Sequence, residues 1–405
     1  MYELFSDMAD PLNLEGIEGL SRDRSDICTI EASCVTGFEE VTVEEVKQLL
    51  GCEAVAQRGR VVFDIQVSRV SEVSRLRCVN TVWVMIGHLE DAGYPDTEEG
   101  QMNTLRDIVN NHLDWEKGLR VWQRYTGCEN KIYTTPEDAA EEKVSFRCTC
   151  YRTGGSHKFK STEVQAAVGG AVHDKFQWNV KCKNYDLEFV INCDLVQVYC
   201  CLTLTNVSLY QRTVSQFGPC TLRPTICAGL VMLGRPQPGD VVLDPLCGGG
   251  TISLEGCQMG PHYHLGAEIH DLAIGRCREN YKELVTRNRL SCRPAADFIQ
   301  WDCLLPCLRD NSVDIIVTDL PFGKRSGSKA DNRVLYPRTL LSLARVVRPG
   351  TGRAVLLTQD KNSMLKSLNK IERYWKSTKF ISTNIGGLTA LVFLLSRTNN
   401  SPCDK

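Results

Sequence analysis

From residue 218 to the end of the chain, short apolar segments typical of strands alternate with amphipathic segments typical of helices. Such alternation forms a parallel sheet with helices on both faces, because each connecting helix packs back onto the sheet. The last two apolar segments, TKFISTNIGG and LTALVFLLS, are expected to pair with each other around Gly386 and Gly387. The sequence therefore predicts a doubly wound α/β sheet that ends in an antiparallel hairpin.

Acidic residues stand where four of the predicted strands end, at Asp244, Glu268, Asp302 and Asp319. Ligands of open parallel sheets bind outside the carboxyl ends of the strands. The first acid precedes the turn PLCGGGT, whose glycines let the backbone approach a ligand closely. Glu268 follows Asp244 by 24 residues, a spacing at which an acid binds a ribose diol. Asp302 is placed to accept from an adenine amino group.

These positions predict a cofactor that contains a nucleoside. The dinucleotide motif G-x-G-x-x-G is not complete, because its sixth position is Ser253, so S-adenosyl-L-methionine is favoured over NAD. The expected cofactor contacts are Asp244, Pro245, Cys247, Gly248, Gly250, Thr251, Glu268, Ile269, Asp302, Cys303 and Asp319.

The stretch TDLPFGKR follows the last of these strands directly. Its DLPF segment resembles the N/D-P-P-Y/F motif of methyltransferases that modify planar exocyclic amines. The resemblance implies that the Asp319 side chain and the Leu320 carbonyl accept hydrogen bonds from a flat –NH₂ group. It also implies that Pro321 fixes the turn and that Phe322 stacks on the base. Positioning then supplies most of the catalytic effect, since the sulfonium is an excellent leaving group.

The first half of the chain has a different pattern. Residues 1–25 are acidic and lack periodicity, so we expect a mobile tail. Residues 26–105 follow the order strand–helix–strand–strand–helix–strand, which is the ferredoxin-like pattern. Residues 106–207 hold a further α+β region, in which GLRVWQRY is a possible strand.

Residues 143–183 carry eight Lys or Arg and two Asp or Glu, which makes this stretch clearly basic. We interpret it as a candidate phosphate-binding surface, with an ordinary solvated face as the alternative. The side chains after DLPF are expected either to bind a substrate phosphate or to cap the loop. The candidate RNA-binding residues are Arg152, Lys158, Lys160, Lys175, Lys181, Lys183, Lys324 and Arg325.

The 20 cysteines are scattered and form no C-x-x-C pair. We therefore expect reduced thiols that serve as small apolar side chains, and no metal site. No apolar run approaches the length of a membrane span, and the first residues lack the pattern of a signal peptide. We expect a cytoplasmic protein, with a nuclear pool as an alternative.

Several longer stretches extend the resemblance, including RTGGSHKFKSTEVQAAVGGAVHDKFQWN, SLYQR, DIIVTDLPFGKR and TGRAVLLTQD. Together they are similar to eukaryotic tRNA guanine-N2 methyltransferases with a THUMP domain. The resemblance covers about residues 26–398 and implies a ferredoxin-like domain (26–105), a THUMP RNA-binding domain (106–207) and a Rossmann-like class I methyltransferase domain (208–399), followed by a tail (400–405).

The same resemblance implies the function. It indicates that the THUMP domain docks the acceptor end of tRNA and that a guanosine of the acceptor stem becomes N2-methylguanosine. A small zinc-binding activator subunit is an expected partner. The alternatives are a guanosine of another small RNA, such as a small nuclear RNA, a protein amide, or a non-catalytic RNA-binding adaptor. The acidic loop at 126–143 is short and lacks the Lys-rich insertion of some relatives.

Overall fold

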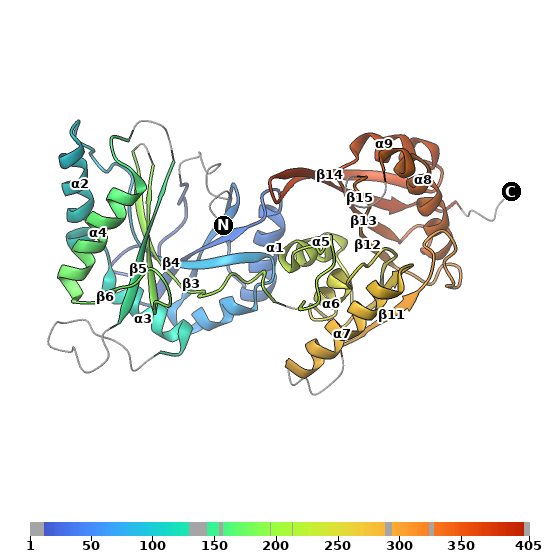
Figure 1. Ribbon diagram of the computed structural model, residues 1–405, viewed down its shortest axis with the longest axis horizontal. Helices are drawn as coiled ribbons and strands as arrows, with labels where there is room; N and C mark the ends of the chain where they lie inside the picture. The colour runs from blue at the N-terminus through green and yellow to red at the C-terminus, as the bar shows by residue number, and fades with distance from the viewer. Residues whose placement is uncertain are drawn as a thin grey trace. The chain divides into compact units, whose positions relative to one another are not determined.

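The computed structural model describes residues 12–128, 144–153, 157–194, 196–212, 214–287, 294–323 and 328–400. The chain divides into two compact units, each with its own sheet (Figure 1). The N-terminal unit is made by the chain up to Cys34 and by Thr42–Ser208, and the C-terminal unit by Val35–Val41 and Leu209–Lys405. Lys324 and Arg325 lie outside the described residues, as does most of the acidic loop.

The N-terminal unit contains an eight-stranded sheet in the order β2-β3-β1-β4-β8-β7-β5-β6. Its first part has the expected element order, with a 3₁₀ helix in the place of the second helix. These elements are β1 (Ile27–Cys34), α1 (Glu39–Leu50), β2 (Ala54–Gln57), β3 (Arg60–Gln66), the 3₁₀ helix (Val67–Arg75) and β4 (Val79–Leu89). The sheet does not end at β4, which pairs with β8, so the ferredoxin-like division at residue 105 stays a prediction.

The rest of the sheet is built from the second part of this unit, where α3 packs against β4 and β8, and α4 against β5. The elements are α2 (Glu98–Asp107), a π turn (Ile108–His112), α3 (Trp115–Thr126), β5 (Ser145–Arg152), α4 (Ser161–Phe176), β6 (Asn179–Val180), β7 (Leu187–Cys193) and β8 (Val198–Thr203). The strand expected at GLRVWQRY is wrong, because this stretch is part of α3. Asp114 accepts from the Lys117 N–H at the helix start, and Gly127 ends the helix at φ 71°.

The mobile tail expected over residues 1–25 is wrong from Leu12 onward. Leu12 is buried against the sheet, and Leu14, Ile17 and Leu20 pack on the same cluster. This cluster consists of Val62, Trp83, Met85, Val190, Tyr199 and Cys201. The segment is ordered because it covers apolar side chains on the sheet, although its own apolar residues are irregularly spaced.

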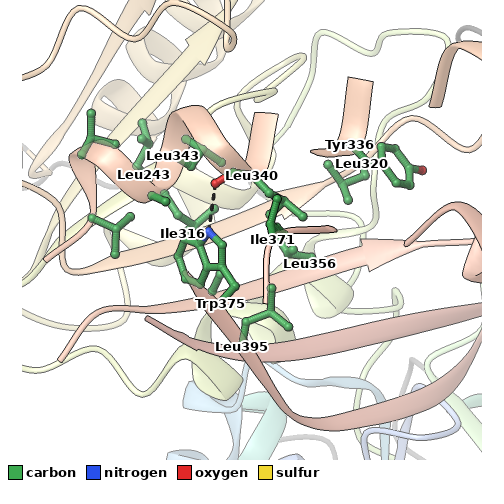
Figure 2. Close-up of a cluster of buried hydrophobic side chains, with 14 of the residues drawn as sticks. Leu243, Ile316, Leu320, Tyr336, Leu340, Leu343, Leu356, Ile371, Trp375 and Leu395 are labelled. Carbon is green, nitrogen blue, oxygen red and sulfur yellow. Dashed lines mark hydrogen bonds between the residues drawn. The ribbon is translucent and has the colours of Figure 1, made fainter. Parts of the chain in front are cut away.

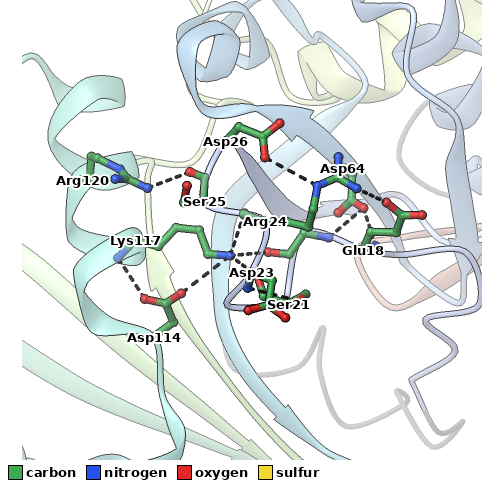
Figure 3. A network of polar contacts seen from close by, with 11 residues as sticks. Glu18, Ser21, Asp23, Arg24, Ser25, Asp26, Asp64, Asp114, Lys117 and Arg120 are labelled. Carbon is green, nitrogen blue, oxygen red and sulfur yellow. Dashed lines mark hydrogen bonds and ion pairs between the residues drawn. The ribbon is translucent and has the colours of Figure 1, made fainter.

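Polar contacts hold the main chain of this segment in place (Figure 3). The buried Lys117 Nζ donates to the carbonyls of Gly19 and Ser21, both at 2.8 Å, and to that of Arg24 at 3.2 Å. The Asp64 carboxylate accepts from the N–H of Gly19 at 2.9 Å and of Glu18 at 2.6 Å. One buried cation and one carboxylate therefore fix both ends of residues 18–24.

Replacing Lys117 by methionine should lower the free energy of unfolding of the N-terminal unit by about 2–4 kcal/mol, because three carbonyls lose a charged donor. Arg120→Met is the matched control, since the exposed Arg120 donates to the Ser25 carbonyl at 2.7 Å and to no other group among the described residues. Calorimetry of the full chain should show the Lys117→Met transition at a clearly lower temperature than that of Arg120→Met. Equal transitions would contradict this role of Lys117.

The C-terminal unit contains a seven-stranded sheet in the order β11-β10-β9-β12-β13-β15-β14. The first five of these strands are parallel, and β15 is antiparallel to both β13 and β14. The elements are α5 (Pro224–Gly234), β9 (Val241–Asp244), α6 (Thr251–Gly256), β10 (Tyr263–Glu268), α7 (Asp271–Arg287), β11 (Ala296–Gln300), β12 (Ile315–Asp319), α8 (Lys329–Val346), β13 (Arg353–Thr358), α9 (Lys361–Lys370), β14 (Trp375–Ile385) and β15 (Leu388–Arg397). The predicted sheet and its closing hairpin are confirmed.

A continuous apolar cluster joins α8 to the strands of this sheet (Figure 2). Trp375 lies at its centre, 1% exposed, and its indole N–H donates to the Leu340 carbonyl at 2.9 Å. Leu320, from the segment after β12, belongs to the same cluster. The core therefore fixes the strand ends at which the expected acids stand.

Two expectations from composition concern the cysteines and membrane-spanning segments. Most of the cysteines that the structure describes are buried, and all of these are free thiols. Within the described residues, no helix is both long and apolar enough to cross a membrane.

Candidate active site

The strand order reverses between β9 and β12, and ligands of doubly wound sheets bind at this point. Asp244 is the last residue of β9, and Asp319 is the last residue of the neighbouring β12. Glu268 ends β10, which pairs with β9 on the other side. Asp302 follows β11 by two residues. The fold therefore brings all four expected acids to the same edge of the sheet.

The buried Asp244 carboxylate orders the start of the glycine turn. Its Oδ1 accepts from the Thr318 hydroxyl at 2.7 Å and from the Leu246 N–H at 3.2 Å. Burial raises the pKa of Asp244 to about 7, the two hydrogen bonds limit the rise, and the charge of Glu268 adds to it. Asp244 therefore changes charge near neutral pH.

The glycine turn depends on backbone conformations that other residues rarely adopt. Gly248 has φ 54° and Gly250 has φ 83°. A Cβ at Gly248 would meet no described atom within 4 Å, so there is open space beside its Cα. The N–H of Gly250 donates to the Cys247 carbonyl at 2.7 Å, and α6 begins at Thr251. At Gly248 the turn thus leaves space for a ligand next to the backbone.

Asn280 on α7 supports this turn and was not predicted. Its side chain is fully buried and donates to the Gly249 carbonyl at 3.0 Å and the Gln216 carbonyl at 3.2 Å. Its Oδ1 accepts from the N–H groups of Ser215 and Gln216. An asparagine within a helix gives no sequence signal for such a role, because the contact depends on the tertiary structure.

Both carboxylate oxygens of Glu268 accept hydrogen bonds from the backbone. Its Oε1 accepts from the N–H groups of Ile269 at 2.9 Å and His270 at 3.2 Å, and its Oε2 accepts from that of Gly248 at 3.0 Å. The carboxylate therefore ties the glycine turn to the end of β10. Oε2 accepts one such bond and retains capacity for a ligand hydroxyl.

The cofactor residues next to these acids differ in what they expose. The Ile269 side chain is 51% exposed, beside Glu268. Cys247 and Cys303 are buried, and their sulfur atoms face Cys277 Sγ at 3.8 Å and Thr339 Oγ1 at 3.6 Å. Pro245 and Thr251 are buried as well. Of the residues in this group, Ile269 is therefore the one with an exposed side chain.

Asp302 starts a short turn beyond β11. Its Oδ1 accepts from the Leu304 N–H at 2.9 Å, and its side chain is partly buried. No hydrogen bond to Oδ2 is found among the described residues. The second carboxylate oxygen is therefore available to a ligand.

The DLPF segment places an acceptor without a partner at the order reversal. Asp319 Oδ1 is buried and has no hydrogen-bond partner among the described residues. Burial and the nearby Asp244 raise the pKa of the Asp319 carboxyl well above its usual range. A buried polar atom without a partner is costly, so this oxygen is suited to a ligand that donates a hydrogen bond.

Leu320 stands where the wider motif has proline, and its contacts explain the difference. Its N–H donates to the Leu357 carbonyl of β13 at 2.9 Å, a bond that proline cannot make. Its side chain is 2% exposed in the core cluster. Phe322 is partly exposed, as a ring that stacks on a base must be.

The six described basic candidates lie in the N-terminal unit, and they differ in their contacts. The side chains of Lys181 and Lys183 are exposed and have no ion pair or hydrogen bond among the described residues. Lys158 and Lys175 donate to the carbonyls of Asp96 and Asn110. The remaining two are exposed, with Lys160 Nζ 3.9 Å from Glu163 and Arg152 bonded to Ser161 and to the Phe159 carbonyl. Their role in RNA binding stays a prediction.

Aromatic residues near these lysines belong to the core. Phe176 and Trp178 stack on each other with ring centroids 4.4 Å apart, and both are buried. Within the described ranges, no group of three or more His, Cys, Asp or Glu residues is arranged to hold a metal ion.

Two family models match the chain, one in each of the two compact units. The THUMP domain family matches residues 130–205, and the family described as UPF0020, RMKL-like, methyltransferase domain, matches residues 212–390. TrmN from Thermus thermophilus, a solved crystal structure, has a TM-score of 0.72 at 24% identity, covering 91% of this chain and 99% of that one. The fold and the site define a class I methyltransferase that carries a THUMP domain.

Curated relatives narrow the class further. The tRNA (guanine(6)-N(2))-methyltransferase THUMP3 of Bos taurus is 34% identical over 92% of this chain and 89% of its own length. The chain belongs to this THUMP3 family of tRNA guanine-N2 methyltransferases. The U6 snRNA (guanine-N(2))-methyltransferase THUMPD2 of Bos taurus is more distant, at 27% identity over 67% of this chain and 52% of that protein. The family resemblance seen in the sequence is confirmed.

Proposed function

We propose that this protein transfers a methyl group from S-adenosyl-L-methionine to the exocyclic N2 of a guanosine in the acceptor stem of tRNA. The observation that carries the proposal is the buried Asp319 Oδ1, which has no partner among the described residues and lies at the order reversal of the sheet. The family of tRNA guanine-N2 methyltransferases supports the substrate.

The site fits the cofactor by its donor and acceptor groups. Glu268 Oε2 and Asp302 Oδ2 retain capacity for a ribose hydroxyl and an adenine amino group. The open space at Gly248 admits a ligand next to the backbone. Asp244 would stabilise the positively charged methionine portion. When bound, the cofactor supplies an activated methyl group on a sulfonium.

The segment after β12 would position the methyl acceptor. Asp319 and the Leu320 carbonyl accept the two hydrogens of the amine, which directs the nitrogen lone pair towards the methyl group. Phe322 stacks on the guanine, while Pro321 restricts the turn. The chemistry needs little acid or base assistance, so orientation accounts for most of the rate. The base must leave its helical stack to reach this segment.

The N-terminal unit would bind the acceptor end of the RNA through phosphate contacts. Lys181 and Lys183 are suited to this role, because no described acidic side chain pairs with them. A small zinc-binding activator subunit, expected from the family resemblance, completes the proposed enzyme. We propose that the protein acts in the cytoplasm, with a nuclear pool as the alternative.

Cofactor affinity should increase with pH through about 7, where Asp244 ionises. A cationic ligand favours the carboxylate, so binding releases a proton and is weakened when Asp244 is protonated. The dissociation constant at pH 6 should exceed the plateau value above pH 8 by up to about tenfold. Titration calorimetry measures it, and Asp244→Asn should bind more weakly and lose the part of the pH dependence centred near 7. The same dependence in that variant would contradict this assignment.

A comparison of two RNAs tests the proposed substrate. The full chain, alone and with the activator subunit, is incubated with labelled cofactor and either total tRNA or a U6 snRNA transcript. Transfer to tRNA supports the proposal. Transfer to U6 snRNA alone would favour the activity named for the more distant relatives. Failure to bind the cofactor at all would favour a non-catalytic adaptor.

A further inference from the structure

We propose that Tyr336, on α8, is a positioning residue that holds the DLPF segment in the geometry needed for methyl transfer; this inference rests on the proposed function. Tyr336 is fully buried, and its hydroxyl lies 2.5 Å from the Pro321 carbonyl oxygen and 2.8 Å from Thr358 Oγ1. Figure 2 shows its ring next to Leu320. No feature of the sequence separates this tyrosine from an ordinary core residue.

The direction of each hydrogen bond follows from the groups involved. A carbonyl oxygen only accepts, so the Tyr336 hydroxyl must donate to Pro321. The Thr358 hydroxyl must then donate to the Tyr336 oxygen, because the phenol has a single proton. Thr358 Oγ1 in turn accepts from the Asp360 N–H at 2.9 Å. The chain of bonds therefore runs one way, from the start of α9 to the DLPF segment.

Burial also keeps the Tyr336 hydroxyl protonated, so that it remains a donor. The pKa of the Tyr336 phenol is raised by burial, so the hydroxyl keeps its proton across the working range of pH. Asp360, which begins this chain of bonds, is itself fixed: it accepts from the Ser363 N–H and from the Asn332 side chain. Each member of the chain therefore has a defined orientation.

The consequence concerns the Leu320 carbonyl, the second proposed acceptor for the amine. Leu320 is held through its N–H, which donates to the Leu357 carbonyl. The next residue is fixed on the other side, where the Pro321 carbonyl accepts from Tyr336. The Leu320 carbonyl lies between these two anchor points. Loss of the Tyr336 hydroxyl releases one of them, so the acceptor and the Phe322 ring lose their fixed orientation.

The test is Tyr336→Phe in the full chain, which removes the hydroxyl and keeps the ring. In steady-state methyl transfer to total tRNA, kcat should fall about 10- to 100-fold, because a small misplacement of reacting groups has effects of this size. The KM for tRNA and the dissociation constant of S-adenosylmethionine should stay within about twofold. Thr358→Val should reduce kcat less, and Thr358→Ser should restore it, since serine keeps the hydroxyl.

Tyr281→Phe is the matched control. Tyr281 on α7 donates to the Pro294 carbonyl at 3.0 Å, so the variant loses the same kind of bond elsewhere in this unit. A Tyr336→Phe variant with wild-type kcat, or one that loses only as much activity as Tyr281→Phe at equal thermal stability, would overturn the proposal. If Tyr336→Phe does not fold, Thr358→Val with wild-type kcat would overturn it equally. A wild-type chain without any transfer would instead count against the proposed function.

Discussion

Replacing Asp319 by alanine should lower kcat for methyl transfer by about 10²–10³-fold, the size of effect seen when one preorganised polar group is removed from an active site. The folded protein should be at least as stable as wild type, which is unusual for the loss of a polar side chain with a buried oxygen. This combination of lost activity and retained stability follows from the surroundings of the carboxylate.

Asp319 contributes little to the fold that alanine would remove. Its Oδ1 has no hydrogen-bond partner among the described residues, so no bond to that oxygen is lost. Burial and the charge of Asp244 raise its pKa, which means that the ionised carboxylate is disfavoured in the folded state. A carboxyl with a raised pKa destabilises the fold above the pKa of the unfolded chain, and alanine removes that cost at neutral pH.

Asp319→Asn is the matched control for this prediction. The amide oxygen still accepts a hydrogen bond from the substrate amine, so this variant should retain clearly more activity than Asp319→Ala. Rates from initial velocities and stability from thermal unfolding separate the two effects. Equal activity of Asp319→Ala and wild type would refute the role of this side chain, and a large loss of stability would refute its description as unpaired.

Replacing Gly250 by alanine should strongly lower the free energy of unfolding of the C-terminal unit. Its φ of 83° is strained for any residue with a Cβ, and a Cβ there would lie 2.7 Å from the Phe298 ring. The left-handed conformation costs about 1–2 kcal/mol and the overpacking about 1–3 kcal/mol. The free energy of unfolding should therefore fall by about 2–5 kcal/mol, with a loss of cofactor binding because the turn is displaced.

The neighbouring glycine supplies the control. Gly249 does not have a positive φ, and a Cβ there would meet its nearest heavy atoms at 3.7 Å, an ordinary contact. Gly249→Ala should therefore unfold within about 0.5 kcal/mol of wild type, as for substitutions free of strain and clash. Denaturant titration of both variants measures the difference. Equal destabilisation of both variants would contradict the conformation described for Gly250.

The sheet and the acids of the site were predictable because each depends on local sequence. Alternating patterns define the strands, and the ends of parallel strands meet at one edge. Asp244, Glu268, Asp302 and Asp319 can therefore be placed together from the sequence alone. The residues that support them cannot. Thr318, Asn280 and Tyr336 reach the site only through tertiary contacts.

Two local predictions failed for a physical reason. GLRVWQRY contains apolar residues that suit a strand or a helix, and the cap at Asp114 together with packing on β4 and β8 decides for the helix. Residues 12–25 are polar overall, yet four irregularly spaced apolar side chains are enough to attach them to the sheet. Neither outcome follows from periodicity alone.

The most direct test of the account is to identify the methylated nucleoside. The full chain is incubated with S-adenosylmethionine carrying an isotope-labelled methyl group and with total eukaryotic tRNA, in the presence of the activator subunit. The tRNA is then digested to nucleosides and analysed by mass spectrometry. The account predicts labelled N2-methylguanosine from the wild type and almost none from Asp319→Ala. Label in a different nucleoside, or equal label from both proteins, would contradict it.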